Sequence, residues 1–115
     1  MAVLTPLSAA EVAARIKAGK AVLVDIREAA EVARERIAGS VVKPLSAFGA
    51  ADLEVQPGRD VIYMCRSGAR TGMNCVRLAA CIPGEAFVLD GGLNAWKAEG
   101  LPTVAESGNP PSRTA

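Results

Sequence analysis

Histidine is absent from the 115 residues of this chain. Its absence removes the commonest general base and the commonest metal ligand, and it excludes hydrolases built on a Ser-His-Asp or Cys-His arrangement. No charge of one sign is in excess, because 13 Lys and Arg stand against 12 Asp and Glu. Nucleic-acid-binding domains usually carry a clear basic excess, so we expect no nucleic-acid partner.

Cysteines are also few, and none of them forms a CxxC pair. Without that pair, Cys65, Cys75 and Cys81 predict neither a zinc ribbon nor a thioredoxin-type redox centre, and we expect no metal and no cofactor. The N-terminus lacks the basic and apolar segments of a signal peptide. No apolar run reaches the ~18 residues of a membrane span. Together these absences predict a cytoplasmic protein with reduced thiols and no membrane segment.

Aromatic residues make up only 3% of the chain, while hydrophobic residues make up 50% and charged residues 22%. This composition is typical of one globular domain with an aliphatic core. We place that domain at residues 1–104. Residues 105–115 are rich in Ser, Gly, Asn and Pro, and we expect a flexible C-terminal tail there.

Strand and helix patterns alternate along the domain. We predict strands over 21–26, 40–43, 60–64 and 85–89, and helices over 8–18, 28–35, 46–51, 71–81 and 93–99. Ser8 and Glu11 have the spacing of a capping box at the first helix. On the helix over 71–81 we expect Met73, Val76, Leu78 and Ala80 to face inward. The alternation predicts an α/β fold with a central parallel sheet and helices on both faces.

The segment that predicts chemistry is the loop CRSGART, residues 65–71. Cys65 ends a buried strand shortly before a helix, which places its thiol at the carboxyl edge of the sheet, where open α/β folds bind ligands. Amides of a loop that curls around the sulfur would form an anion nest, and Gly68 permits the sharp turn. Arg66 and Arg70 add positive charge. We therefore predict a lowered pKa for Cys65 and a reactive thiolate.

The competing interpretation is that Cys65 is a small buried hydrophobic residue, as unpaired cysteines often are. For Cys75 and Cys81 that plain role, packing or incidental exposure, is the one we predict. Two more polar residues end the strand over 21–26. Asp25 needs a partner there, and we predict an ion pair with Arg70 that shapes the loop, against the alternative of a solvated carboxylate. We expect Arg27 to support the structure or the pocket rim.

The loop CRSGART, the strand VLVDIRE (22–28) and the segment LDGGLNAW (89–96), followed by GLP (100–102), resemble the rhodanese homology domain of the single-domain sulfurtransferase type. The resemblance covers residues 5–104. It implies a five-stranded, mostly parallel sheet. One departure is ERIAG over 35–39, where family members often have Gly-His-Ile-Pro-Gly. We assign Gly91 and Gly92 only a tight turn, and Trp96 a place in the core.

The resemblance also implies an activity, thiosulfate sulfurtransferase. Cys65 would take the outer sulfur of thiosulfate or a related donor as a persulfide and pass it to cyanide or a thiol. The loop amides and charges would bind the donor, and they belong to Arg66, Ser67, Gly68, Ala69, Arg70 and Thr71. A sulfur-carrier protein is a further partner that the family suggests.

Three alternatives remain open at this point. The first is a phosphatase or arsenate reductase, which the loop argues against: four residues separate Cys65 from Arg70, and phosphatases of related sequence have five. The second is a non-catalytic regulatory module. The third is redox sensing at Cys65, which could coexist with sulfur transfer.

Overall fold

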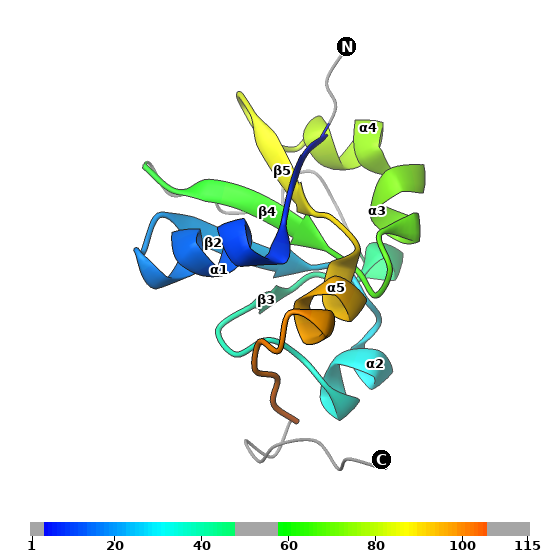
Figure 1. Ribbon diagram of the computed structural model, residues 1–115. Helices are drawn as coiled ribbons and strands as arrows, with labels where there is room; N and C mark the ends of the chain where they lie inside the picture. The colour runs from blue at the N-terminus through cyan, green and yellow to red at the C-terminus, as the bar shows by residue number, and fades with distance from the viewer. Residues whose placement is uncertain (1–3, 48–57, 106–115) are drawn as a thin grey trace.

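The computed structural model describes residues 4–47 and 58–105 (Figure 1). Within them, five strands form one sheet in which each pair of neighbours is parallel. The strand order is β1 (Leu4–Leu7), β5 (Ala86–Leu89), β4 (Asp60–Met64), β2 (Ala21–Asp25), β3 (Val41–Val42). The predicted α/β class is therefore confirmed. Most of the predicted helix over 46–51 and nearly all of the predicted tail lie outside the described residues; Leu45–Ala47 form a 3₁₀ turn.

Helices cover both faces of the sheet, as expected. The helices are α1 (Ala9–Lys17), α2 (Ala29–Arg34), α3 (Ala69–Met73), α4 (Cys75–Ala79) and α5 (Gly92–Ala98). Helices α1 and α5 pack on one face through Val12, Leu93 and Trp96, which are buried in the larger core cluster. Helix α4 packs on the opposite face, where Leu78 belongs to the second cluster. The expected place of Trp96 in the core is confirmed.

The alternation of β4 decides on which face the reactive loop begins. Ile62 and Met64 point into the core beneath α1 and α5, whereas Tyr63 and Cys65 belong to the cluster on the α4 side. This is the two-residue period of a strand. Tyr63 also donates a hydrogen bond of 2.9 Å from its hydroxyl to the carbonyl of Leu78, which ties α4 to the sheet.

Two expectations about secondary structure need correction. Strand β1 was not predicted, because it is short and contains Pro6; it lies at the sheet edge, where a residue without an N–H is tolerated. The single helix predicted over 71–81 is two helices separated by Asn74, whose side-chain amide donates to the carbonyl of Arg70 at 2.8 Å. Met73 and Val76, expected to face inward, are exposed.

The spacing of these residues explains the difference in burial. At about 100° per residue, Met73, Val76 and Ala80 fall on one side of a helix and Leu78 on the opposite side, so the burial of Leu78 leaves the other three facing outward. Leu78 is buried as predicted, whereas Ala80 is exposed.

Candidate active site

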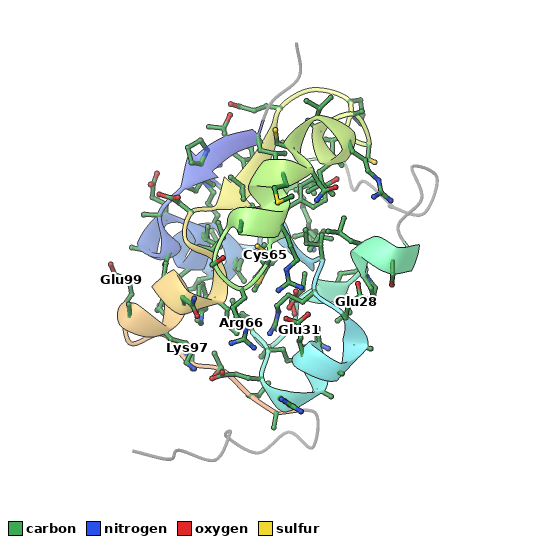
Figure 2. The ribbon with its side chains drawn as sticks, turned by 90° about the vertical axis from the view of Figure 1, so that its right-hand side faces the viewer. Glu28, Glu31, Cys65, Arg66, Lys97 and Glu99 are labelled. Atoms are coloured by element: carbon green, nitrogen blue, oxygen red, sulfur yellow. The ribbon has the colours of Figure 1, made fainter. Side chains whose placement is uncertain are left out.

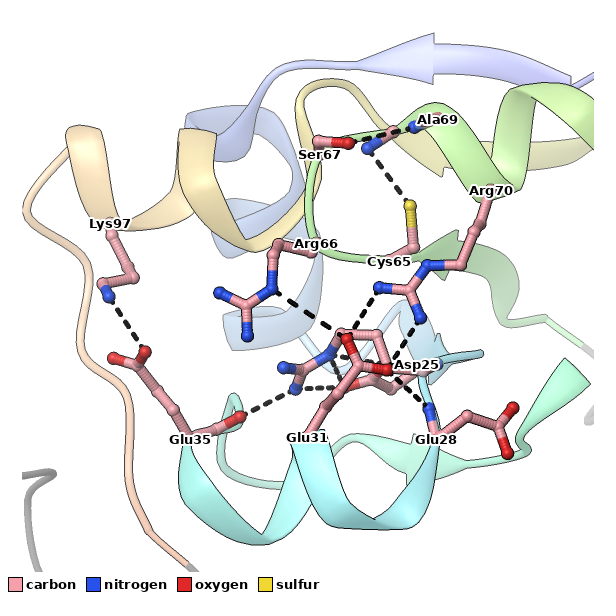
Figure 3. Close-up of polar contacts among 12 residues, drawn as sticks. Asp25, Glu28, Glu31, Glu35, Cys65, Arg66, Ser67, Ala69, Arg70 and Lys97 are labelled. Carbon is pink, nitrogen blue, oxygen red and sulfur yellow. Dashed lines mark hydrogen bonds and ion pairs between the residues drawn. The ribbon is translucent and has the colours of Figure 1, made fainter.

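Cys65 follows β4 directly and lies at the carboxyl edge of the sheet, at the start of the loop that leads into α3. The loop turns at Gly68, which has a φ of +96° and precedes the first residue of α3. This left-handed conformation suits glycine because it lacks a Cβ. The turn brings the Gly68 amide to 3.1 Å from the Cys65 sulfur, to which it donates (Figure 3).

The Cys65 side chain has no exposed surface, yet its surroundings favour the thiolate. Burial raises the pKa of the thiol, but hydrogen bonds from the main-chain amides of Thr71, Gly68 and Arg70 outweigh it. The pKa therefore lies below the ordinary value of 9.0. Such amides stabilise a negative charge, as they do in other anion nests. Cys65 is thus buried, as the competing interpretation held, but in a polar cradle rather than a dry one.

The cradle uses fewer amides than the six that the sequence suggested. The amide of Ala69 donates to the Ser67 hydroxyl at 3.3 Å instead of to the sulfur. The Thr71 hydroxyl donates to the carbonyl of Gly68 at 2.9 Å and lies 3.8 Å from the Cys65 sulfur. Ser67 and Thr71 therefore stabilise the loop through hydrogen bonds within it, in addition to any contact with a ligand.

The N-terminus of α5 fixes the same loop from the other side. The amides of Leu93 and Asn94 each donate at 2.9 Å, to the carbonyls of Cys65 and Arg66 respectively. A Cβ on Gly92 would lie 2.4 Å from the Cys65 carbonyl oxygen, so only glycine permits this approach. The sequence suggested no more than a tight turn at this position, because the contact joins segments that are far apart along the chain.

The expected ion pair between Asp25 and Arg70 is wrong. Asp25 pairs instead with Arg27, which donates from Nε at 3.0 Å and from Nη2 at 2.8 Å, and both side chains are completely buried. Arg27 also donates to the carbonyl of Glu35 at 2.7 Å, which connects β2 to the end of α2. Only Ile26 separates Asp25 from Arg27 at the end of the strand, so this arginine is within reach without any contact between distant segments. The support role expected for Arg27 agrees with these contacts.

Arg70 has a different partner, Glu31 of α2, which the sequence did not single out. Arg70 donates to both oxygens of Glu31, at 2.7 and 2.9 Å, in a bidentate pair. Arg66 lies 3.9 Å from the same carboxylate (Figure 3). The hydrogen bond from Arg70 lowers the pKa of Glu31 from 4.5 to about 2, against the opposing effect of burial. One carboxylate thus faces both cations that were expected to attract the donor.

The other two cysteines contribute no thiol to this cradle. Both are half-buried and, like Cys65, unbridged; Cys81 donates to the carbonyl of Arg77 at 3.4 Å. Cys75 lines a neighbouring hollow of about 210 Å³ together with Thr71, Asp90 and Gly91. Across residues 4–47 and 58–105, no three carboxylate or thiol side chains are grouped so that they could hold a metal ion. In that same part of the chain, no helix has the length and apolar character needed to cross a membrane.

Known proteins share both the sequence pattern and the fold. The rhodanese-like domain model matches residues 8–99. A sulfurtransferase of Allochromatium vinosum is 40% identical over 86 residues, 75% of this chain and 80% of the relative. Thiosulfate sulfurtransferase of Pseudomonas aeruginosa superposes with a TM-score of 0.77 at 25% identity, over 91% of this chain and 20% of that one. A rhodanese-related protein of Thermoplasma volcanium superposes with a TM-score of 0.71 at 26% identity, over 87% of this chain and 97% of that one. The chain therefore belongs to the rhodanese-like domain family.

Proposed function

We propose that this protein is a sulfurtransferase in which Cys65 carries the transferred sulfur as a persulfide. The observation that carries the proposal is the position of the Cys65 sulfur in a cradle of main-chain amides, which favours its thiolate. Its relative in A. vinosum is a sulfurtransferase, and a structural neighbour is a thiosulfate sulfurtransferase. Both support the same chemistry here.

The reaction would proceed in two displacements at sulfur. The Cys65 thiolate attacks the outer sulfur of thiosulfate or a related donor; a new S–S bond forms, the donor's S–S bond breaks, and sulfite leaves with the bonding electron pair. An acceptor, cyanide or a thiolate, then attacks the terminal sulfur, and the electron pair of the persulfide bond returns to Cys65. Because the thiolate is already favoured, no general base is needed, which suits a chain without histidine.

The cradle would act on the intermediate as well as on the resting thiolate. A persulfide carries its negative charge on the terminal sulfur, and fixed N–H dipoles in a site shielded from water stabilise such charge at little reorganisation cost. The Cys65 side chain is completely buried, so the loop must open to admit the donor's outer sulfur. Because the amides of Leu93 and Asn94 hold the carbonyls of Cys65 and Arg66, we expect this movement to involve the loop residues after Arg66.

Intact-mass spectrometry after incubation with thiosulfate tests the proposal. We expect the wild-type protein to gain one sulfur atom, to lose it on addition of cyanide with formation of thiocyanate, and Cys65→Ser to gain none. Cys75→Ser is the matched control, because it removes a half-buried thiol outside the cradle, and it should load normally. A wild-type protein that never gains sulfur from any sulfane donor would indicate a non-catalytic module. Hydrolysis of an aryl phosphate without sulfur loading would indicate a phosphatase.

A further inference from the structure

We infer that Glu31 determines which sulfur donors the site accepts: it selects against the thiosulfate dianion and for donors that carry no more than one negative charge. The inference rests on the proposed sulfur transfer at Cys65 and concerns the substrate class of that site. It follows from where Glu31 lies, how firmly it is held, and the charges that it leaves at the mouth of the loop.

Glu31 is held in place by three hydrogen bonds. Its Oε2 accepts from the main-chain amide of Glu28 at 3.0 Å, at the first turn of α2, and from Arg70 at 2.7 Å; its Oε1 accepts from Arg70 at 2.9 Å. Charge-assisted bidentate pairs are among the stronger hydrogen bonds in proteins. The carboxylate is therefore held firmly beside the two arginines of the Cys65 loop, and a donor that approaches those arginines meets it in this position.

The charges around the thiol balance as a result. Arg66 and Arg70 are the two cations beside Cys65, and both face the Glu31 carboxylate, at 3.9 and 2.7 Å. With Cys65 as thiolate, two positive charges meet two negative charges. The nearby pair of Asp25 and Arg27 is neutral in sum and buried. A site that looks strongly cationic in the sequence thus offers no net positive charge to an incoming anion.

Donor charge then matters directly. Each fixed charge acts on a donor in proportion to the donor's charge, so the Glu31 carboxylate disfavours a dianion about twice as strongly as a monoanion at the same position and cancels part of the attraction from the two arginines. Both cations are also already engaged, so a dianion would have to compete with Glu31 for Arg70. Organic thiosulfonates and persulfide anions carry a single negative charge on the molecule that delivers the sulfur, and they belong to the class that the site favours.

The test compares two donors of different charge. We would measure kcat/KM for thiosulfate and for methanethiosulfonate, which deliver the same sulfur atom and release sulfite and methanesulfinate respectively. Glu31→Gln removes the charge and keeps a side chain of the same shape. We expect the thiosulfate-to-methanethiosulfonate ratio to rise roughly tenfold in this variant. Glu31→Asp keeps the charge and should retain the wild-type ratio within about threefold.

Glu99→Gln is the matched control, since Glu99 is exposed beyond the end of α5, well away from Cys65 (Figure 2). It removes the same charge and should leave the ratio unchanged. A purely structural role for Glu31 would lower both kcat/KM values together, so an unchanged ratio in Glu31→Gln overturns the inference. So does a ratio that rises equally in Glu99→Gln.

The salt dependence of the donor ratio in the wild-type protein provides a second test that needs no variant. If the site presents no net positive charge, added NaCl should leave the donor ratio unchanged or raise it, because salt screens the repulsion of thiosulfate. A ratio that falls steeply with salt would show a cationic site and overturn the inference. Loading from neither donor would instead refute the proposed sulfur transfer itself, and this inference with it.

Discussion

Two arginine–carboxylate pairs lie at the carboxyl edge of the sheet, and they differ mainly in burial. Asp25 and Arg27 are completely buried, and they lie two positions apart at the end of β2. Glu31 and Arg70 are about one-third exposed and join two helices across 39 residues of sequence. The buried pair connects β2 to the end of α2 through the Glu35 carbonyl, whereas the open pair connects α2 to the helix that follows the Cys65 loop.

The buried pair should give the largest effect when it is broken. Asp25→Asn leaves the Arg27 guanidinium buried without a countercharge, and we expect the free energy of unfolding to fall by about 3–5 kcal/mol. Urea unfolding measures the change. Asp60→Asn is the matched control, because Asp60 pairs with Arg15 at 3.0 Å on a more exposed surface and should cost less than about 1 kcal/mol. Equal losses in the two variants would contradict the comparison.

The open pair should affect activity more than stability. Arg70→Ala removes the bidentate contact that ties α3 to α2, and we expect kcat/KM for a sulfur donor to fall roughly tenfold further than in Arg66→Ala, while stability falls by about 1 kcal/mol or less. Arg66 is half-exposed and lies 3.9 Å from Glu31, so its removal disturbs the loop less. Steady-state kinetics with thiosulfate measure both variants. Equal losses would mean that Arg70 does not order the loop.

Acid should weaken the pair of Glu31 and Arg70 over a defined pH range. We expect this change in the free energy of unfolding to be the smallest of the three effects. The pKa of Glu31 is lowered from 4.5 to about 2 in the folded protein, so the pair contributes its full stability above about pH 4.5. That contribution is lost as the pH falls toward 2. We expect wild type to exceed Glu31→Gln in unfolding free energy by a constant amount at pH 6 and above. The two should converge near pH 2; a gap that widens with acid would contradict the assignment.

Local features of the fold were predictable because short segments of the chain determine them. Ser8 caps α1 as expected, accepting from the Glu11 amide at 3.1 Å, and Glu11 completes the capping box. The predicted strand over 21–26 matches β2 (Ala21–Asp25), and four of its five residues are buried. The position of Cys65 between a buried strand and a helix likewise needs only neighbouring residues, and the structure places it as predicted.

Contacts between distant segments could not be predicted in the same way. Asp25 and Glu31 are both carboxylates near the sheet edge, and nothing in their spacing says which one meets Arg70. Packing of α2 against the loop decides it in favour of Glu31. Gly92 shows the same limit, because its required lack of a Cβ depends on a carbonyl of Cys65 elsewhere in the chain.

The packing of α5 against the loop that begins at Cys65 affects how the protein loses activity during proteolysis or partial unfolding. Helix α5 lies near the end of the described residues, and the amides of its first turn donate hydrogen bonds to the carbonyls of Cys65 and Arg66. Any event that detaches this helix, such as proteolytic nicking after β5 or local fraying, would leave the cysteine in place but release the peptide groups that aim the cradle. Sulfur loading should then be lost before the sheet itself unfolds, so activity would report the docking of a helix whose amides bind the main-chain carbonyls of the loop.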